Sequence, residues 1–103
     1  MQGMEELMRQ AQAMQTKMAE MQQELANKRV EGSSGGGMVR AVATGKQEIV
    51  SVSIEKSVVD PGEIDMLQDL VTAAVNDALR RSRELAEKDM SALAGGLKIP
   101  GLF

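Results

Sequence analysis

The sequence contains no cysteine and no histidine. The absence of cysteine excludes disulfide scaffolds, thiolate zinc sites and thiol nucleophiles. The absence of histidine removes the commonest general base and a common metal ligand, and no other pairing of nucleophile and base stands out in the chain. We therefore expect a binding protein and not an enzyme, with no cofactor, no bound metal and no small-molecule substrate.

Aromatic residues are almost absent as well, since Phe103 is the only one. A hydrophobic core has to be built from Met, Leu, Val, Ile and Ala, and such a core buries less area per residue. A chain of 103 residues suits one domain but leaves much of its surface exposed. Association with a second copy is the simplest remedy. The lack of aromatic side chains also argues against stacking on single-stranded nucleic acid.

Long apolar runs are missing too. No stretch is long enough to span a bilayer, and residues 1–6 lack the basic and then apolar order of a secretory signal. We therefore expect a cytoplasmic protein without a membrane partner.

The net charge is −3, whereas a nucleic-acid-binding domain is normally basic. The acidity is local, because residues 60–79 contain five acids and no base. The densest basic cluster follows directly, at Arg80, Arg81 and Arg83, with Lys88 nearby. The distribution of charge is therefore more informative than its sum.

Two interpretations of this basic cluster remain open. It is either a surface that contacts phosphates or a solvated helix face held by ion pairs across one turn. The expected ion pairs are Arg80–Glu84, Arg83–Glu87 and Glu84–Lys88.

Apolar residues recur at alternating spacings of three and four in the first quarter of the chain: Met4, Leu7, Ala11, Met14, Met18, Met21 and Leu25. This spacing predicts an amphipathic helix with a coiled-coil seam. We interpret the methionines as the core of that seam. The alternative is an adaptable surface for partner peptides.

Four glycines among residues 32–37 end the first helix and predict a flexible turn. The stretch lacks the GK[ST] ending of a phosphate-binding loop, and a strand follows it instead of a helix. Alternating runs at residues 39–44 and 49–55, joined across Gly45-Lys46, predict a β-hairpin. A third short strand at residues 29–33 would pair with the first of these.

The motif at residues 60–63 predicts the start of a second helix, with Asp60 as the N-cap and Pro61 at the first helical position. The apolar pattern extends this helix to about Leu93. We expect it to end before Gly95.

These elements predict an α+β fold with a long N-terminal helix, a three-stranded antiparallel sheet and a long C-terminal helix (α-β-β-β-α). Residues 1–94 would form a single domain, and residues 95–103 a flexible tail rich in Gly and Pro. Helices of about 40–45 Å overhang so small a sheet, so we expect their apolar stripes to pack against a second copy related by two-fold symmetry. The expected dimer interface contains Leu7, Met14, Met18, Met21, Val50, Val52, Leu67 and Val71.

The sequence resembles the YbaB/EbfC family of small bacterial nucleoid-associated proteins over nearly its whole length. The resemblance rests on MQTKM at residues 14–18, GGGMV at 35–39, Gly45-Lys46, and above all DMLQDLVTAAVNDA at 65–78. Met90, Gly95-Gly96-Leu97 and the ending PGLF also fit the family.

The resemblance implies a tweezer-like homodimer with projecting helices that binds duplex DNA in the nucleoid. It favours the phosphate-contact interpretation, because Arg80 and Arg81 lie where family members commonly carry Lys or Arg. Phosphate contacts position a protein without reading bases, so we expect little sequence specificity. The acidic residues 60–77 would face away from the duplex. The expected DNA-binding residues are Arg9, Lys17, Arg80, Arg81, Arg83 and Lys88.

The alternative function is that of a protein-protein interaction module. In it, Met-lined helix surfaces or the tail at residues 97–103 would hold a partner protein, and DNA would play no part. The acidic balance of the chain favours this alternative.

Overall fold

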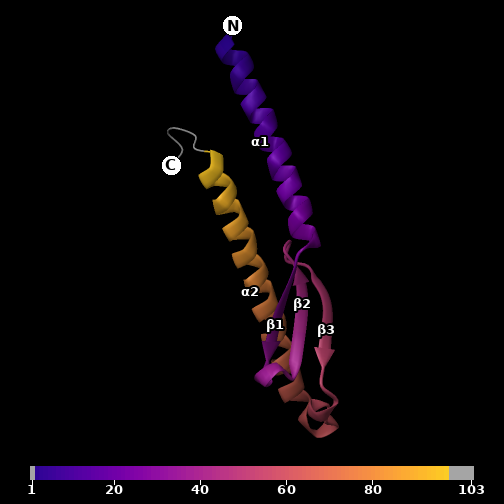
Figure 1. Cartoon of the computed structure of the whole chain (residues 1–103). Helices are drawn as coiled ribbons and strands as arrows, with labels where there is room; N and C mark the ends of the chain where they lie inside the picture. The colour runs from indigo at the N-terminus through magenta and orange to yellow at the C-terminus, as the bar shows by residue number, and fades with distance from the viewer. Residues whose placement is uncertain (1, 98–103) are drawn as a thin grey trace.

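The computed structural model describes residues 2–97, and Figure 1 shows how their elements are arranged. The predicted order α-β-β-β-α is confirmed. Short 3-10 turns lie at Gly35–Gly37, Lys56–Val58 and Pro61–Glu63. The main elements are helix α1 (Gln2–Asn27), strands β1 (Arg29–Ser34), β2 (Val39–Thr44) and β3 (Ile49–Ile54), and helix α2 (Ile64–Leu97).

The three strands form one antiparallel sheet in the order β1-β2-β3. The predicted hairpin and the third strand are both confirmed. Gly32, which the sequence placed in a flexible turn, belongs instead to β1, where it pairs with Ala41. The turn is confined to residues 35–37, whose glycines all adopt positive φ angles. Gly32 is in the strand because its missing side chain serves packing and not turning.

Helix α2 covers one face of β1 and β2 (Figure 1). A Cβ atom built on Gly32 would lie 2.2 Å from the backbone nitrogen of Ala78 and 2.7 Å from the carbonyl oxygen of Ala74. Helix and strand are therefore in direct backbone contact at this glycine. The core consists of small residues around it: Val39, Ala41, Ala43, Val58, Ala74 and Ala78.

The buried hydroxyl of Ser82 extends this contact toward the β2–β3 turn. Its Oγ donates to the carbonyl oxygen of Thr44 at 2.7 Å and accepts from the backbone N–H of Gln47 at 2.9 Å. Two helical turns, at Ala78 and Ser82, therefore face the sheet. This fixes the rotation of α2 about its own axis.

Strand β3 lies at the margin of the sheet face that α2 covers. Every residue of β3 is exposed, although Val52 and Ile54 pair with the buried Ala41 and Val39 and so point to the same face of the sheet. One third of the apolar sheet face is therefore open in the isolated chain.

Helix α1 meets the sheet near its C-terminal end. The backbone N–H of Gly45 donates to the carbonyl oxygen of Leu25 at 2.8 Å, and the Leu25 side chain is buried. From there α1 runs away from the sheet beside the second half of α2 (Figure 1). The radius of gyration is 20.0 Å, against about 13 Å for a compact chain of this length. The expected overhang of the helices is therefore present.

The predicted start of α2 is confirmed, but its predicted end is wrong. The Asp60 side chain accepts from the Gly62 N–H at 2.9 Å, and Pro61 begins the 3-10 turn that leads into the helix. The helix then continues through Gly95 to Leu97. Glycine costs a helix only about 1 kcal/mol and keeps the backbone N–H, so it does not force an end. The rest of the predicted tail, residues 98–103, lies outside the described residues.

Gly32→Ala should destabilise the fold, because the new methyl group would collide with the α2 backbone, which cannot move as a side chain can. We expect a loss of about 3 kcal/mol, typical of an overpacked contact, measured by urea unfolding. Gly3→Ala is the matched control, because nothing lies within 4 Å of a Cβ at Gly3. Equal stability of the two variants would contradict this account of the contact.

Candidate nucleic-acid interface

The predicted basic cluster lies on α2 just beyond the residues that pack on β1. Because Ala78 and Ser82 face the sheet, the side chains of Arg80 and Arg83 point away from it. Asn76 shares this outward face at the spacing i, i+4, i+7. A shallow depression of ≈ 350 Å³ is lined by Asn76, Arg80 and Arg83 together with Ala73 and Asp77. Asn76 was not among the predicted residues, although its spacing to Arg80 and Arg83 is visible in the sequence.

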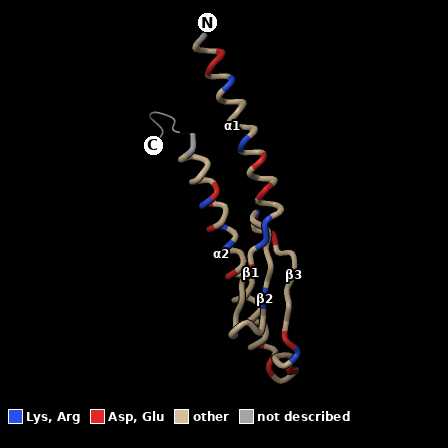
Figure 2. Tube along the Cα trace, viewed as in Figure 1, with Lys and Arg blue, Asp and Glu red and all other residues tan. Residues whose placement is uncertain are grey.

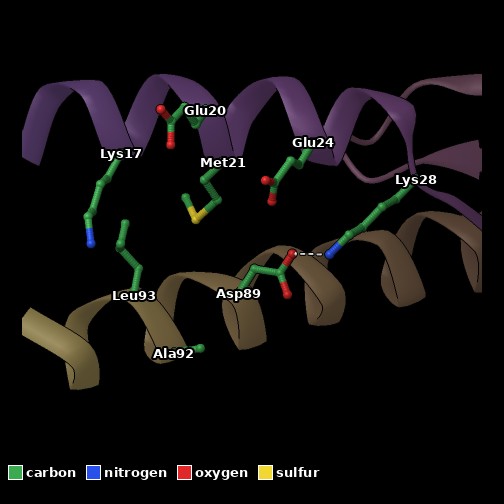
Figure 3. Close-up of a pocket in the computed structure, with 8 residues that line it drawn as sticks. All are labelled: Lys17, Glu20, Met21, Glu24, Lys28, Asp89, Ala92 and Leu93. Carbon is green, nitrogen blue, oxygen red and sulfur yellow. Dashed lines mark hydrogen bonds and ion pairs between the residues drawn. The ribbon is translucent and has the colours of Figure 1, made fainter.

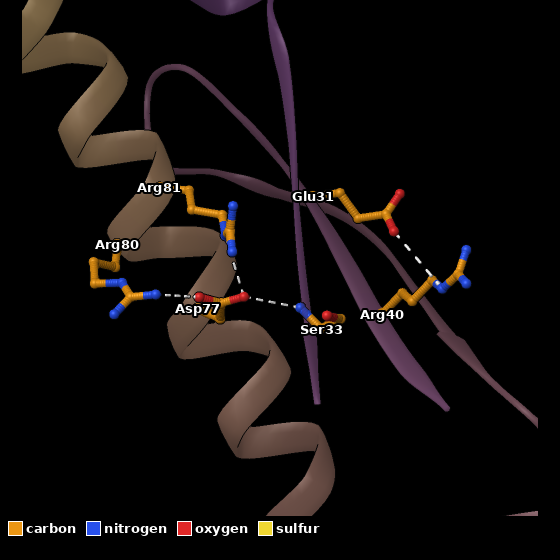
Figure 4. A network of polar contacts seen from close by, with 6 residues as sticks. All are labelled: Glu31, Ser33, Arg40, Asp77, Arg80 and Arg81. Carbon is orange, nitrogen blue, oxygen red and sulfur yellow. Dashed lines mark hydrogen bonds and ion pairs between the residues drawn. The ribbon is translucent and has the colours of Figure 1, made fainter. Parts of the chain in front are cut away.

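Asp77 is the centre of a polar network that the sequence did not predict (Figure 4). Its carboxylate accepts from the backbone N–H of Ser33 at 3.0 Å, from Arg80 Nη2 at 2.5 Å and from Arg81 Nε at 3.2 Å. The Ser33 N–H, reinforced by the two guanidinium groups, lowers the pKa of Asp77 from its ordinary value. Asp77 thus ties both arginines to the edge of β1.

This network corrects the expectation about ion pairs. The ion pairs predicted within residues 80–88 are not formed in the described part of the chain, where Arg80 and Arg81 pair backward with Asp77. Asp77, the last acid of residues 60–77, lies within the basic cluster, and the orientation of that acidic segment relative to a duplex stays a prediction. The backward pairing prevails because Asp77 is already held in place by Ser33.

The remaining cations of α2 are less engaged. Within residues 2–97, neither Arg83 nor Lys88 forms an ion pair. Lys88 lies two helical turns after Arg81, on the flank of α2 and not on its outward face. Figure 2 shows that acids and bases alternate along this part of α2, so the positive surface is narrow.

The two predicted cations of α1 are not gathered with the cluster on α2. Arg9 is exposed on the first part of α1, with Nη1 3.8 Å from Glu6 Oε2. Lys17 lines a cleft of ≈ 330 Å³ between α1 and α2. The six predicted residues therefore occupy separate parts of an elongated chain.

The cleft between the two helices is closed at its base by an ion pair (Figure 3). Lys28 Nζ donates to Asp89 Oδ2 at 2.7 Å. This hydrogen bond raises the pKa of Lys28. Met21 and Leu93 form the apolar part of the lining. The ion pair joins the residue that follows α1 to the second half of α2.

The predicted interface residues differ in how far their own chain covers them. Met21 is already buried within the chain, and Met14, Leu67 and Val71 are half-buried. Leu7, Met18, Val50 and Val52 are exposed.

Comparison with known proteins decides the family. The model of the YbaB/EbfC DNA-binding family matches residues 1–97. The chain belongs to this family. This match confirms the resemblance seen in the sequence. The family is named for DNA binding and not for an enzymatic activity.

Curated relatives of this YbaB/EbfC chain carry the name nucleoid-associated protein. One from Syntrophobacter fumaroxidans is 59% identical over 95 residues, which cover 92% of this chain and 86% of the relative. One from Desulforamulus reducens is 56% identical over 101 residues, which cover 98% and 96%.

A solved structure has the same fold. The crystal structure of an uncharacterized protein from Helicobacter pylori matches with a TM-score of 0.66 and 22% identity, over 84% of this chain and 87% of that one. None of the helices within residues 2–97 of this YbaB/EbfC chain is long and apolar enough to cross a membrane.

Asp77→Asn should make the free energy of unfolding depend less on pH in the acidic range. A carboxylate whose pKa is lowered in the folded state stabilises the fold at pH values above its ordinary pKa of about 4. This stabilisation is lost as the pH falls through the lowered pKa. We therefore expect the variant to be less stable than the wild type at pH 7 and to lose less stability between pH 7 and pH 2, measured by urea unfolding. Asp69→Asn, at an exposed position of the same helix, removes the same charge and is the control, and it should cost less stability at pH 7 than Asp77→Asn.

Proposed function

We propose that this protein binds duplex DNA in the nucleoid as a homodimer, through phosphate contacts with little sequence specificity. The observation that carries this proposal is the outward face of α2 with Asn76, Arg80 and Arg83, opposite the face that packs on the sheet, in a chain that belongs to a DNA-binding family. Nucleoid-associated relatives at 59% and 56% identity support it.

The chemistry of the cluster suits phosphates better than bases. A guanidinium carries five N–H donors in a planar fork, so Arg80 and Arg81 keep donors free while they bind Asp77. Two arginines and one aspartate leave a net charge of +1, and Arg83 adds a further positive charge. No aromatic side chain is present within residues 2–97 to stack on an unpaired base. Positioning on the duplex backbone is therefore the supported mode.

The proposed site also includes the cations around this face. Lys88 extends it along α2, and Arg9 and Lys17 would add contacts from α1. A single subunit carries few unpaired cations, so it would bind weakly on its own. A dimer doubles the number of phosphate contacts and converts two weak contacts into one stronger binding event.

We propose that the dimer forms at the open third of the sheet. Val50 is 53% and Val52 41% exposed on β3, and Leu67 and Val71 of α2 are half-buried. The other edge of the sheet is engaged, because the outward N–H of Ser33 on β1 is bound by Asp77. An apolar edge strand without proline or an inward charge is a preferred surface for pairing with another chain.

Arg83→Ala should weaken binding to random-sequence duplex and flatten its salt dependence. Each lost phosphate contact reduces the slope of log K against log salt by about 0.9, so a dimer with both copies of the site bound should lose about 2. Fluorescence anisotropy across a salt series measures both quantities. Arg80→Ala combined with Arg81→Ala should act in the same direction.

Arg40→Ala is the matched control for Arg83→Ala. Arg40 is exposed on the sheet face that α2 does not cover, 3.7 Å from Glu31 (Figure 4), and its loss changes the net charge equally. Equal effects of the two substitutions would contradict the proposed site. Failure of the wild type to bind duplex at near-physiological salt would favour the alternative, a protein-protein interaction module.

Val52→Lys should convert the dimer to a monomer, because it places a charge within the open apolar face. Sedimentation velocity at micromolar concentration should give the mass of one chain for this variant and of two chains for the wild type. Ser51→Lys is the control, since Ser51 lies on the same strand but points to the opposite face. A two-chain mass for Val52→Lys would contradict the proposed interface.

A further inference from the structure

The first part of α1 carries an apolar stripe that its own chain leaves uncovered. All residues from 3 to 13, here named the α1 overhang, are exposed. Met4, Leu7 and Met8 are 67%, 64% and 63% exposed. Farther along the same seam, Met21 and Leu25 are 7% and 3% exposed. The coiled-coil seam is thus covered at one end and bare at the other.

The overhang is far from the proposed dimer surface on β3. Leu25 rests against the β2–β3 turn, and Leu7 lies about 27 Å farther along the axis of α1, away from the sheet. The chain measures 73 × 22 × 16 Å, so the two apolar surfaces occupy different parts of a rod. The sequence had combined both in one interface.

We propose that the α1 overhang is a second self-association surface, which binds the α1 overhang of another dimer and so links two dimers on DNA. Contacts within one dimer would be made on β3, and contacts between dimers on α1. A symmetric dimer then presents two overhangs, one for each neighbour. The link to DNA rests on the proposed function, whereas the helix contact does not.

The residues beside the stripe favour an identical helix as the partner. The flanking positions Gly3, Gln10 and Gln15 are uncharged, and Figure 2 shows no charge on α1 between Arg9 and Lys17. Charged flanks are what coiled coils use to select a different partner and to reject their own copy. Here two copies meet without like-charge repulsion, since Glu6 and Arg9 pair with each other away from the stripe.

The length of the overhang limits the strength of this contact. It supplies fewer than two heptads of seam, and stable coiled coils usually have at least about three. Free dimers should therefore associate weakly. Dimers held near one another by DNA have a high effective concentration, which makes a weak contact productive. The result would be bridging of two duplex segments, or of distant sites on one duplex.

A single-cysteine variant tests the contact directly, because the chain has no cysteine of its own. Leu7→Cys should form intermolecular disulfides readily under mild oxidation in the presence of duplex. Ala13→Cys, on the other side of the helix, should form few. After the DNA is removed, light scattering should give a native mass of four or more chains for oxidised Leu7→Cys. Equal crosslinking of both variants, or a native mass of two chains, would overturn the proposal.

A capture assay tests the consequence for DNA. Immobilised duplex with bound protein should retain a second, labelled duplex. Leu7→Glu should bind a single duplex as tightly as Ala13→Glu, which adds the same charge, but should lose most of the retention. Retention by Leu7→Glu equal to that of Ala13→Glu, or none by the wild type, would overturn bridging. A wild type that binds no duplex at all would instead refute the proposed function, and the cysteine result would still decide whether the overhangs meet.

Discussion

The backbone contact between α2 and β1 at Gly32 is the constraint on which the rest of the structure depends. It brings Ala74 and Ala78 against the strand and, with the Ser82 hydroxyl, fixes the rotation of α2. Helix rotation in turn decides which side chains reach solvent, so the outward position of Arg80 follows from the contact made on the other side of the helix. The same contact covers two strands and leaves the third open.

The positive charge of the basic cluster depends on which arginines are paired and which face outward, and not on the overall charge of the chain. The chain is acidic overall, and Asp77 neutralises part of the cluster it sits in. A net positive face survives because Arg83 points outward without an ion pair among the described residues. In the proposed function, binding by such a face depends on repetition, either two copies of the face in a dimer or several dimers along the duplex, since each contact is weak. The proposal therefore couples self-association to DNA binding.

Most of the fold could be predicted from the sequence because its signals are local. The seam of α1, the alternation in β2 and β3 and the cap at Asp60 each act within a few residues. The end of α2 could not be located, because Gly95 weakens a helix without breaking it. Gly32 was assigned to a turn because a glycine that permits close packing has the same sequence signal as one that permits a turn. The arginine cluster could be seen in the sequence from its density, whereas the network that joins it to Asp77 and Ser33 could not, because Ser33 lies 44 residues away in the chain.

By itself, the sequence determined which segments are helices and strands, which stripes are apolar and to which family the chain belongs. Only the tertiary structure decided which parts of those stripes are covered and which cations are paired. The physical reason is the separation along the chain between the groups that interact. Helical and strand periodicity are set by neighbours in the chain, whereas the Asp77–Ser33 hydrogen bond and the cover over each apolar surface depend on distances between segments that are far apart in the sequence.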